Sequence, residues 1–410
     1  IGLLDTHFPL DATFLPPPGP LAGDVAFISH SGAICAAVID WARGQGFGLS
    51  RLISLGNQAD VNETDLLGPV AGDPFSKVLT LYLEGVSDGV RFIREAQRLS
   101  QRKPVIALKV GRFKSGQQAV ASHTGALAGQ EIAYDAAFRR AGVIRADTSE
   151  DMFDWARALA WCPLPRGRSA AVLTNAGGPG AAAADMLEAD GMALARLNPD
   201  TLETLRGLLP PEASLSNPVD MLASASPEHY AACLRILLDD PGVHSILVIL
   251  PPPPMYTAGS VAKAIIPVIH GANKPVVIAL MGERLIQEAV EHFRAARIPE
   301  YRFPERAASA LSILSQRADY LKRADQNPIS FNDIDKAQAA QIIDTFRSGD
   351  AGVFLPQGIA NKLLQAYGIH TLQVETALTP EAAVSKARRI GYPIALKINS
   401  PEIAHKTDVK

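Results

Sequence analysis

A single histidine, His123, stands among mostly small residues in the segment Ala121–Gly129. The segment follows a basic stretch, Lys109–Gly116, and precedes a helical pattern. Small neighbours let a large anionic group approach closely, and imidazole is well suited to carry a proton or a phosphoryl group near neutral pH. A loop histidine taken alone is more often an ordinary solvated residue, so the interpretation depends on which other segments lie beside it.

Two strand–turn–helix corners are candidate phosphate sites. In the first, the apolar run Asp24–Ile28 meets the turn Ser29–Gly32, and a helical pattern starts at Ala33. Such a corner points free backbone N–H groups and the positive end of a helix dipole at whatever lies above it, which suits a phosphate. The turn lacks the complete G-x-G-x-x-G pattern, and most corners of this kind bind nothing.

The second corner joins the strand Ser169–Thr174 to a helix through the turn Asn175–Gly180. Its glycines, Gly177, Gly178 and Gly180, leave an even barer approach to the helix N-terminus. Glycines that only permit close packing of strand and helix are the alternative, and the sequence does not decide between the two.

A carboxylate, Glu84, falls just past the end of the apolar strand Val78–Leu83. A glutamate beside a histidine can fix its tautomer and stabilise its cationic form. A solvated glutamate at a strand end is the commoner case.

Ligands of a parallel α/β sheet lie outside the carboxyl ends of its strands. Four segments fall at that edge here, and their number favours function: Ser29–Gly32, Gly56-Asn57, Glu84 and the loop with His123.

Lys397 alternates into the apolar run Ala395–Ile398. A buried lysine is costly unless it pairs with an anion, and a nucleotide phosphate is a natural partner. A lysine on an edge strand that points to water is equally compatible. The polar segment His405–Asp408 is compatible with a plain loop.

The elements that position these residues alternate between short apolar runs and helical patterns, which predicts an α/β fold of two consecutive flavodoxin-like, doubly wound parallel-sheet domains. The strands of the first are expected at 24–28, 51–55, 78–83, 104–110 and 143–146, and those of the second at 169–174, 245–250 and 275–281. The expected domains are 24–162 and 167–322, preceded by an irregular Pro-rich segment 1–23. A linker, 323–334, then leads to the start of a third α/β domain, 335–410, with helices near 335–346, 356–367 and 380–390 and strands at 371–374 and 393–398.

The bulk composition excludes several classes of protein. The chain has 410 residues, a hydrophobic content of 47%, 20% charged residues and a net charge of −3. This is a globular composition without the basic excess of a nucleic-acid-binding protein. The three cysteines are far apart and form no CxxC pair, which fits a reducing cytosol. The most apolar run, Ile246–Leu250, ends at Pro251 and is far shorter than a membrane span. The start at Ile1 and an unfinished last domain lead us to expect a piece of a longer protein.

Taken together, the motifs resemble those of the NDP-forming acyl-CoA synthetases, the succinyl-CoA synthetase superfamily, in the fused arrangement of ADP-forming acetyl-CoA synthetases. The resemblance covers nearly the whole chain from Gly23 and rests on an ordered set of motifs. These motifs are Phe27–Ala33, Ser54–Asp60, Tyr82–Gly85, Ser122–Gly129, Asn175–Gly180 and Asn217–Asp220. Leu396-Lys397 and Ser400–Asp408 resemble the opening of that family's ATP-grasp domain.

The resemblance implies an acid–thiol ligase that interconverts acyl-CoA, ADP and phosphate with acid, CoA and ATP through a phosphohistidine at His123, oriented by Glu84. The helices that follow the two glycine turns would clasp the phosphate. The implied phosphate-binding residues are Ser31, Gly32, Ala33, Gly125, Gly177, Gly178 and Gly180. Lys397 would touch ATP phosphate, and His405 is a second candidate phosphoryl acceptor. We expect a cytoplasmic homo-oligomer that uses ATP/ADP, CoA and Mg²⁺, with the Mg²⁺ site outside this segment and no metal at His123.

Two departures from the family matter. The N-terminal CoA-binding domain is absent apart from a trailing edge, and the ATP-grasp domain stops early, so we expect residues 1–410 alone to be inactive. The acid stays open, because acetate, propionate, a dicarboxylate and a hydroxycinnamate are all compatible. The alternative function is a ligase-like regulatory scaffold that senses acyl-CoA or nucleotide and is fused to an acetyltransferase domain, although such proteins often lack the catalytic histidine.

Overall fold

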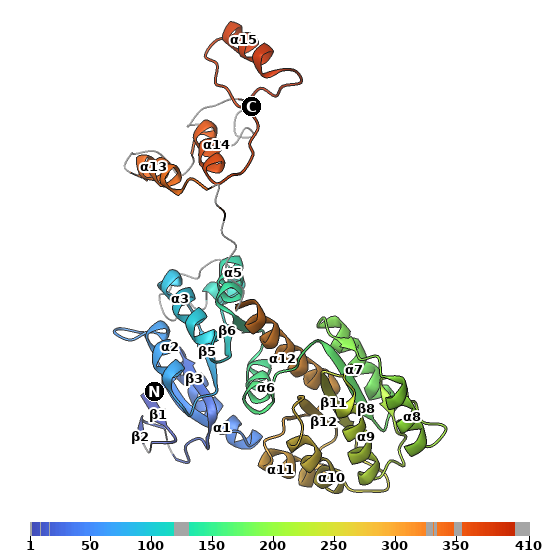
Figure 1. Cartoon of the computed structure of the whole chain (residues 1–410). Coiled ribbons are helices and arrows are strands. Elements are labelled where there is room, and N and C mark those ends of the chain that lie inside the picture. Colours follow the sequence, from blue (N-terminus) through green and yellow to red (C-terminus); the bar gives the residue numbers. More distant parts are fainter. Residues whose placement is uncertain are drawn as a thin grey trace. The chain divides into compact units, whose positions relative to one another are not determined.

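The computed structural model describes residues 2–8, 10–15, 17–118, 131–324, 331, 334–347 and 355–397 (Figure 1). By internal contacts the chain divides into two compact units, Ile1–Gln326 and Asn327–Lys410. The first unit holds two sheets, one with an antiparallel edge and one parallel throughout its strand pairs.

The first sheet has the strand order β2-β1-β4-β3-β5-β6-β7. Its strands are β1 (Gly2–Asp5), β2 (Leu10–Thr13), β3 (Ala22–Ser29), β4 (Leu49–Ser54), β5 (Val78–Leu83), β6 (Val105–Lys109) and β7 (Val143–Ala146). The last five run parallel in the flavodoxin-like order, with the topological switch point between β3 and β5. One face is covered by α2 (Glu63–Gly72), α3 (Gly89–Ser100) and α5 (Glu131–Ala141), and the other by α1 (Gly32–Gln45) and α6 (Ser149–Trp161).

The expectation that residues 1–23 are irregular was wrong for the part before the prolines. There β1 and β2 form an antiparallel hairpin, and β1 pairs with the edge of β4. The Asp5 carboxylate closes the turn, because it accepts the backbone N–H groups of His7 and Phe8 at 2.9 and 2.8 Å. Both strands are too short to be predicted from their own sequence, and pairing of β1 with β4 stabilises them.

The second sheet repeats the plan with the order β10-β8-β11-β12-β13, and β9 also pairs with β8. The strands are β8 (Ser169–Thr174), β9 (Ala193–Leu194), β10 (Val219–Asp220), β11 (Ser245–Leu250), β12 (Val276–Leu280) and β13 (Glu300–Tyr301). All pairings between these strands are parallel. The switch point lies between β8 and β11, so the predicted pair of doubly wound domains is confirmed.

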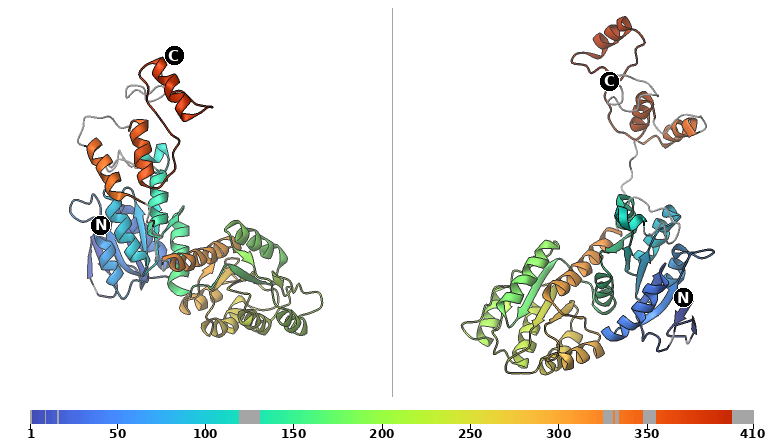
Figure 2. Two further views of the ribbon diagram at one scale, coloured as in Figure 1. Left: turned by 45° about the horizontal axis from the view of Figure 1, so that its top comes forward. Right: turned by 180° about the vertical axis from the view of Figure 1, so that it is seen from behind.

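The side chains of β8 alternate between two cores, as the pleat of a strand requires. Ala171 and Leu173 pack under α8 (Pro199–Leu208), α9 (Pro227–Asp239), α10 (Ala258–His270) and α11 (Gln287–Ala295). Ala170 and Val172 face α7 (Gly177–Ala189) and α12 (Pro304–Ala324). The helices α6 and α12 lie between the two sheets, which thereby share one core (Figure 2).

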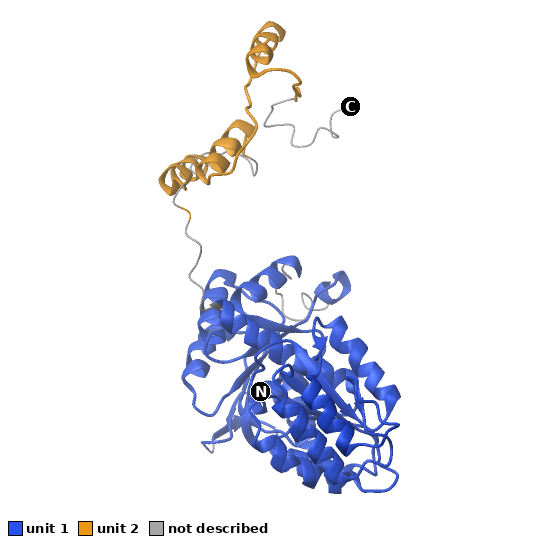
Figure 3. Cartoon of the chain, turned by 45° about the vertical axis from the view of Figure 1, so that its right-hand side comes forward, with its two compact units in different colours: residues 1–326 blue, residues 327–410 orange. Residues whose placement is uncertain are grey.

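The second unit holds α13 (Lys336–Arg347), α14 (Gln357–Ala366) and α15 (Pro380–Ile390), close to the three predicted helices (Figure 3). The strand expected at 371–374 is not formed, and neither is one over 393–397, the described part of the strand expected at 393–398. A strand needs a neighbouring strand to pair its backbone N–H and C=O groups, and no strand is formed within 334–347 and 355–397.

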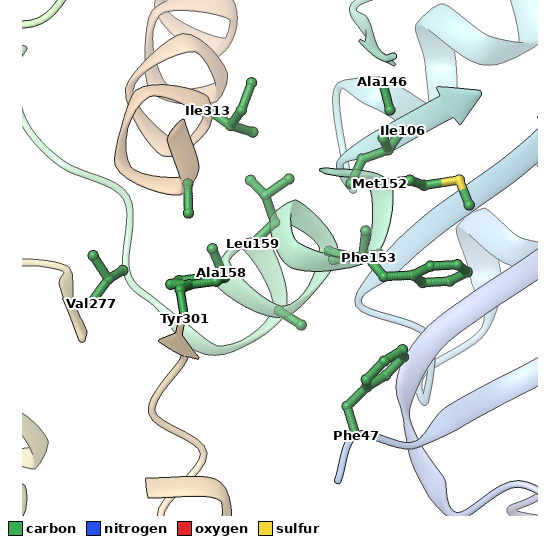
Figure 4. Packing of buried hydrophobic residues seen from close by; sticks show 14 of the residues in the cluster. Phe47, Ile106, Ala146, Met152, Phe153, Ala158, Leu159, Val277, Tyr301 and Ile313 are labelled. Atoms are coloured by element: carbon green, nitrogen blue, oxygen red, sulfur yellow. The ribbon is translucent and has the colours of Figure 1, made fainter. Parts of the chain in front are cut away.

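The shared core of the first unit is centred on α6, whose apolar side chains reach both sheets. Met152 and Phe153 pack toward Phe47 and Ile106 of the first sheet domain, whereas Ala158 and Leu159 lie on the side of Tyr301 (Figure 4).

Among the described residues no helix is long and apolar enough to cross a membrane.

Candidate functional site

The turn after β3 leaves the N-terminus of α1 open. The Ser29 hydroxyl donates to the Ser31 carbonyl at 2.9 Å and accepts the Ser31 N–H at 3.0 Å. Ser31 is the N-cap of α1, yet its side chain makes no capping hydrogen bond, and the first turn holds no acidic residue. The first backbone N–H groups of α1, from Gly32 and Ala33 onward, are therefore suited to an anion.

The turn after β8 has the same local structure. The Thr174 hydroxyl donates to the Ala176 carbonyl at 3.0 Å and accepts the Ala176 N–H at 3.1 Å. Ala176 is the N-cap of α7 and has no side chain that could cap it. Each sheet thus carries an uncapped helix N-terminus at its switch point, after the same hydroxyl-closed turn.

The three glycines of this second turn have different surroundings. A Cβ atom on Gly180 would lie 3.3 Å from Thr174 and 3.4 Å from Pro218, so this glycine serves close packing. A Cβ on Gly177 would lie 3.5 Å from the Asp220 carboxylate. A Cβ on Gly178 would meet nothing within 4 Å, so the open approach is at Gly178.

Glu84 follows β5 directly and therefore lies across the first switch point from the Ser29–Gly32 turn. Glu84 is only 9% exposed. Its backbone N–H donates to Nδ1 of His30 at 3.1 Å, and the N–H of His30 donates to the Tyr82 carbonyl at 3.1 Å. The structure thus brings together Glu84 and the first glycine turn.

Several buried groups around Glu84 escaped the sequence reasoning. The sequence motif places His30 only within a turn, although a histidine in a turn of small residues is a visible signal. Its Nε2 lies 3.3 Å from the carboxylate of Glu63, which begins α2. On the other side of the loop, the Tyr134 hydroxyl accepts the Val86 N–H at 3.1 Å. Neither Glu63 nor Tyr134 belongs to a motif that sequence alone could single out.

Lys109 differs from the rest of the basic stretch with which the sequence groups it. It is the last residue of β6 and is buried, its ammonium lies 4.7 Å from the Tyr134 ring centroid, and it donates to the Val110 carbonyl. Burial lowers the pKa of this ammonium, and the charge of Glu131 opposes the shift. Arg112, three residues on, instead pairs with Glu131 at 2.8 Å and with Asp147.

The buried ammonium of Lys109 gives a pH-dependent prediction. Between the lowered pKa and the ordinary lysine pKa, the unfolded chain binds more protons at Lys109 than the folded chain does. The cost of the buried ammonium to the stability of the fold therefore shrinks as the pH rises through that window. We expect the stability of Lys109→Met relative to wild type to fall as the pH rises from 7 to 10, because the wild type alone loses the penalty of the buried ammonium. Urea denaturation at both pH values measures this. The exposed Lys114→Met is the control, and an equal change in both variants would contradict the assignment.

Four residues of the expected site lie outside the described residues or away from the expected setting. His123 and Gly125 belong to 119–130, and His405 belongs to 398–410, and neither range is described. Lys397 is described, but it is exposed and not part of a strand. The expectation of a strand around Lys397 was wrong, whereas its contact with a nucleotide stays a prediction.

Three family models match the chain in order: a succinyl-CoA ligase like flavodoxin domain over residues 22–159, a ligase-CoA domain over 170–326 and an ATP-grasp domain over 350–410. Two flavodoxin-like domains with glycine turns at their switch points, followed by ATP-grasp sequence, place the chain in the succinyl-CoA synthetase superfamily. Within it, the relatives below identify the chain as a member of the ADP-forming acyl-CoA synthetase family.

The ADP-forming acetate–CoA ligase I of Archaeoglobus fulgidus is 36% identical over all of this chain, which spans 58% of that protein's length. The α subunit of the ADP-forming acetate–CoA ligase II of Pyrococcus furiosus is 41% identical over 78% of this chain and 70% of its own. The solved acetyl-coenzyme A synthetase 1 of Ca. Korarchaeum cryptofilum, in complex with phosphate and ADP, is 37% identical with a TM-score of 0.75, covering 80% of this chain and 72% of that one.

Proposed function

We propose that the protein is an acid–thiol ligase that forms acyl-CoA from a carboxylic acid, CoA and ATP, with release of ADP and phosphate. The family and its named acetate–CoA ligases support this reaction. The observation that carries the proposal is the pair of uncapped helix N-termini at the two switch points, one of them beside Glu84. Such N-termini stabilise a phosphate without a fixed cation.

In this proposal the phosphoryl group moves by way of two intermediates. ATP phosphorylates His123, and the phosphohistidine then gives its phosphoryl group to the acid, which forms an acyl phosphate. The CoA thiol attacks the acyl carbon, and inorganic phosphate leaves. Splitting the reaction in this way lets one phosphoryl group travel between separate nucleotide and acyl sites. Glu84 orients His123, and the N-termini of α1 and α7 hold the phosphate.

The remaining assignments concern the nucleotide and the assembly. Lys397 contacts an ATP phosphate, and His405 is a second phosphoryl acceptor. Mg²⁺ accompanies the nucleotide and would neutralise phosphate charge there, at a site outside this chain segment. We also propose the domain bounds 24–162, 167–322 and 335–410, a cytoplasmic location and a homo-oligomer.

The test uses the protein at its full natural length with ATP, CoA and a panel of acids. Acetate comes first, because the relatives above are acetate ligases, followed by propionate, a dicarboxylate and a hydroxycinnamate. Acyl-CoA formed together with ADP supports the proposal. Release of AMP, or no acyl-CoA with any acid while the protein is folded, contradicts it.

A matched pair of glycine variants tests the phosphate site at α7. Gly178→Ala adds a methyl group where the fold has room, so stability should change by no more than about 1 kcal/mol. The same methyl group obstructs the backbone N–H groups, and we expect the KM for phosphate in the reverse reaction to rise at least about tenfold. Gly207→Ala in α8, which also meets nothing within 4 Å, is the control. Equal KM values in the two variants would exclude this turn as the phosphate site.

The regulatory alternative has a different signature. A sensing scaffold would bind acyl-CoA or nucleotide without forming acyl-CoA, and it would be fused to an acetyltransferase domain. The relatives above are named as ligases, so this alternative gains no support from them. Transfer of an acetyl group to lysine residues of a protein substrate would revive it.

A further inference from the structure

The His30 ring connects three elements at the first switch point. It follows β3, faces the first residue of α2, and holds the first residue after β5. The side chain of His30 is 3% exposed and that of Glu63 is 0% exposed. Burying two polar groups this deeply costs desolvation free energy, which suggests that the pair serves a purpose beyond packing.

The hydrogen bonds fix which ring nitrogen carries the proton. Nδ1 of His30 accepts the N–H of Glu84 at 3.1 Å, so the ring proton lies on Nε2. Nε2 lies 3.3 Å from Oε2 of Glu63, an ion-pair contact without hydrogen-bond geometry, and the other carboxylate oxygen accepts the Thr64 hydroxyl at 3.0 Å. Neither Nε2 nor Oε2 has a hydrogen-bond partner among the described residues.

The same bond holds the backbone at Glu84. The Leu83 carbonyl accepts the Val110 N–H at 3.0 Å, while the Glu84 N–H is held by His30, so this peptide group is fixed on both sides. Two residues on, the Tyr134 hydroxyl accepts the Val86 N–H. The carboxylate of Glu84, in contrast, makes no hydrogen bond or ion pair to another residue that the structure describes.

We propose that His30 is a positioning residue for Glu84, and that Glu63 acts through His30 by fixing its tautomer and ring orientation. This rests on the proposed function, in which Glu84 orients the phosphoryl-carrying His123. A carboxylate that acts on the transition state must be held within a fraction of an ångström, and the buried Glu63–His30 pair supplies a rigid anchor for the peptide that carries it.

Two substitutions at His30 separate positioning from packing. Asn places its Oδ1 where the histidine has Nδ1, so His30→Asn keeps an acceptor for the Glu84 N–H but leaves a void. His30→Leu fills the space but has no acceptor. Positioning predicts that Asn is the better substitute, whereas a packing role predicts Leu. His270→Asn, at an exposed histidine that bonds the Ala296 carbonyl, is the control.

The first measurement is the rate of phosphoenzyme formation in the full-length protein, with KM values for the substrates. We expect His30→Leu to lower this rate about 30-fold or more with KM nearly unchanged, and His30→Asn to stay within about fivefold of wild type. The second is amide hydrogen exchange of the segment Leu83–Val86, which needs no activity. It should accelerate in His30→Leu and stay near wild type in His30→Asn.

The outcomes separate this inference from the proposed function. If wild type forms no phosphoenzyme, the proposed function fails, whatever the exchange shows. If wild type is phosphorylated and His30→Leu matches it, or His30→Asn is the slower variant, only the role of His30 is overturned. Should His30→Leu not fold, His30→Ala, which also lacks the acceptor, replaces it, with the same expected loss and the same criteria.

Discussion

Replacing His123 by Asn is expected to abolish phosphorylation of the protein by acyl-CoA and inorganic phosphate and to lower acyl-CoA formation at least about 10³-fold, because no other group takes over this covalent carrier's role at the acyl site. Asparagine keeps the approximate shape and polarity of the side chain but cannot form a phosphoramidate. The measurement is protein-bound phosphate in the full-length protein after incubation with acyl-CoA and labelled inorganic phosphate in the absence of ADP, where acid-labile and base-stable label identifies phosphohistidine.

The controls distinguish His123 from the other candidate carrier and from a general effect. His405→Asn should leave His123 competent to take a phosphoryl group from the acyl phosphate, which inorganic phosphate forms from acyl-CoA with release of CoA and which becomes the free acid on transfer. The same variant should be labelled more slowly from ATP. His270→Asn should behave as wild type. Label that persists at full level in His123→Asn would show that the phosphoryl carrier is another residue.

The sequence predicts the longer parallel strands of both sheets, because they are apolar and buried, but it does not predict the two-residue strands β9, β10 and β13. A strand such as β11 (Ser245–Leu250) is buried throughout, apolar after its first residue and followed by a proline, so its bounds are visible without any neighbour. The hairpin of β1 and β2 had no such signal, since its strands are short and β2 is largely exposed. Its formation depends on the edge of β4, which a local pattern does not contain.

The site divides in the same way. The glycine turns and Glu84 could be placed at one edge because the carboxyl ends of parallel strands coincide, and that rule needs only the order of the elements. The contact of His30 with Glu63 could not be predicted from the sequence, because it depends on where α2 packs beside the turn after β3. Gly178 and Gly180 look alike in sequence, and only their neighbours separate an open approach from a packing contact.

The second large effect is expected at Arg157, where the two sheet domains meet. Its guanidinium is 4% exposed, donates to the Glu300 carboxylate at 2.8 Å and contacts Asp154 at 3.2 Å. Arg157→Met leaves both carboxylates buried with fewer partners, so we expect a loss of about 3–5 kcal/mol in the free energy of unfolding. In thermal denaturation this corresponds to a drop of about 5–15 °C in Tm.

The size of that loss depends on burial, and a second arginine shows this. Arg302 pairs with Glu283 at 2.6 Å, but both side chains are more than half exposed, so Arg302→Met should cost no more than about 1 kcal/mol. A loss at Arg157 as small as that at Arg302 would contradict the argument. It would mean that the shared apolar core around α6 holds the domains together without the ion pairs, since Met152, Phe153 and Leu159 pack there in either variant.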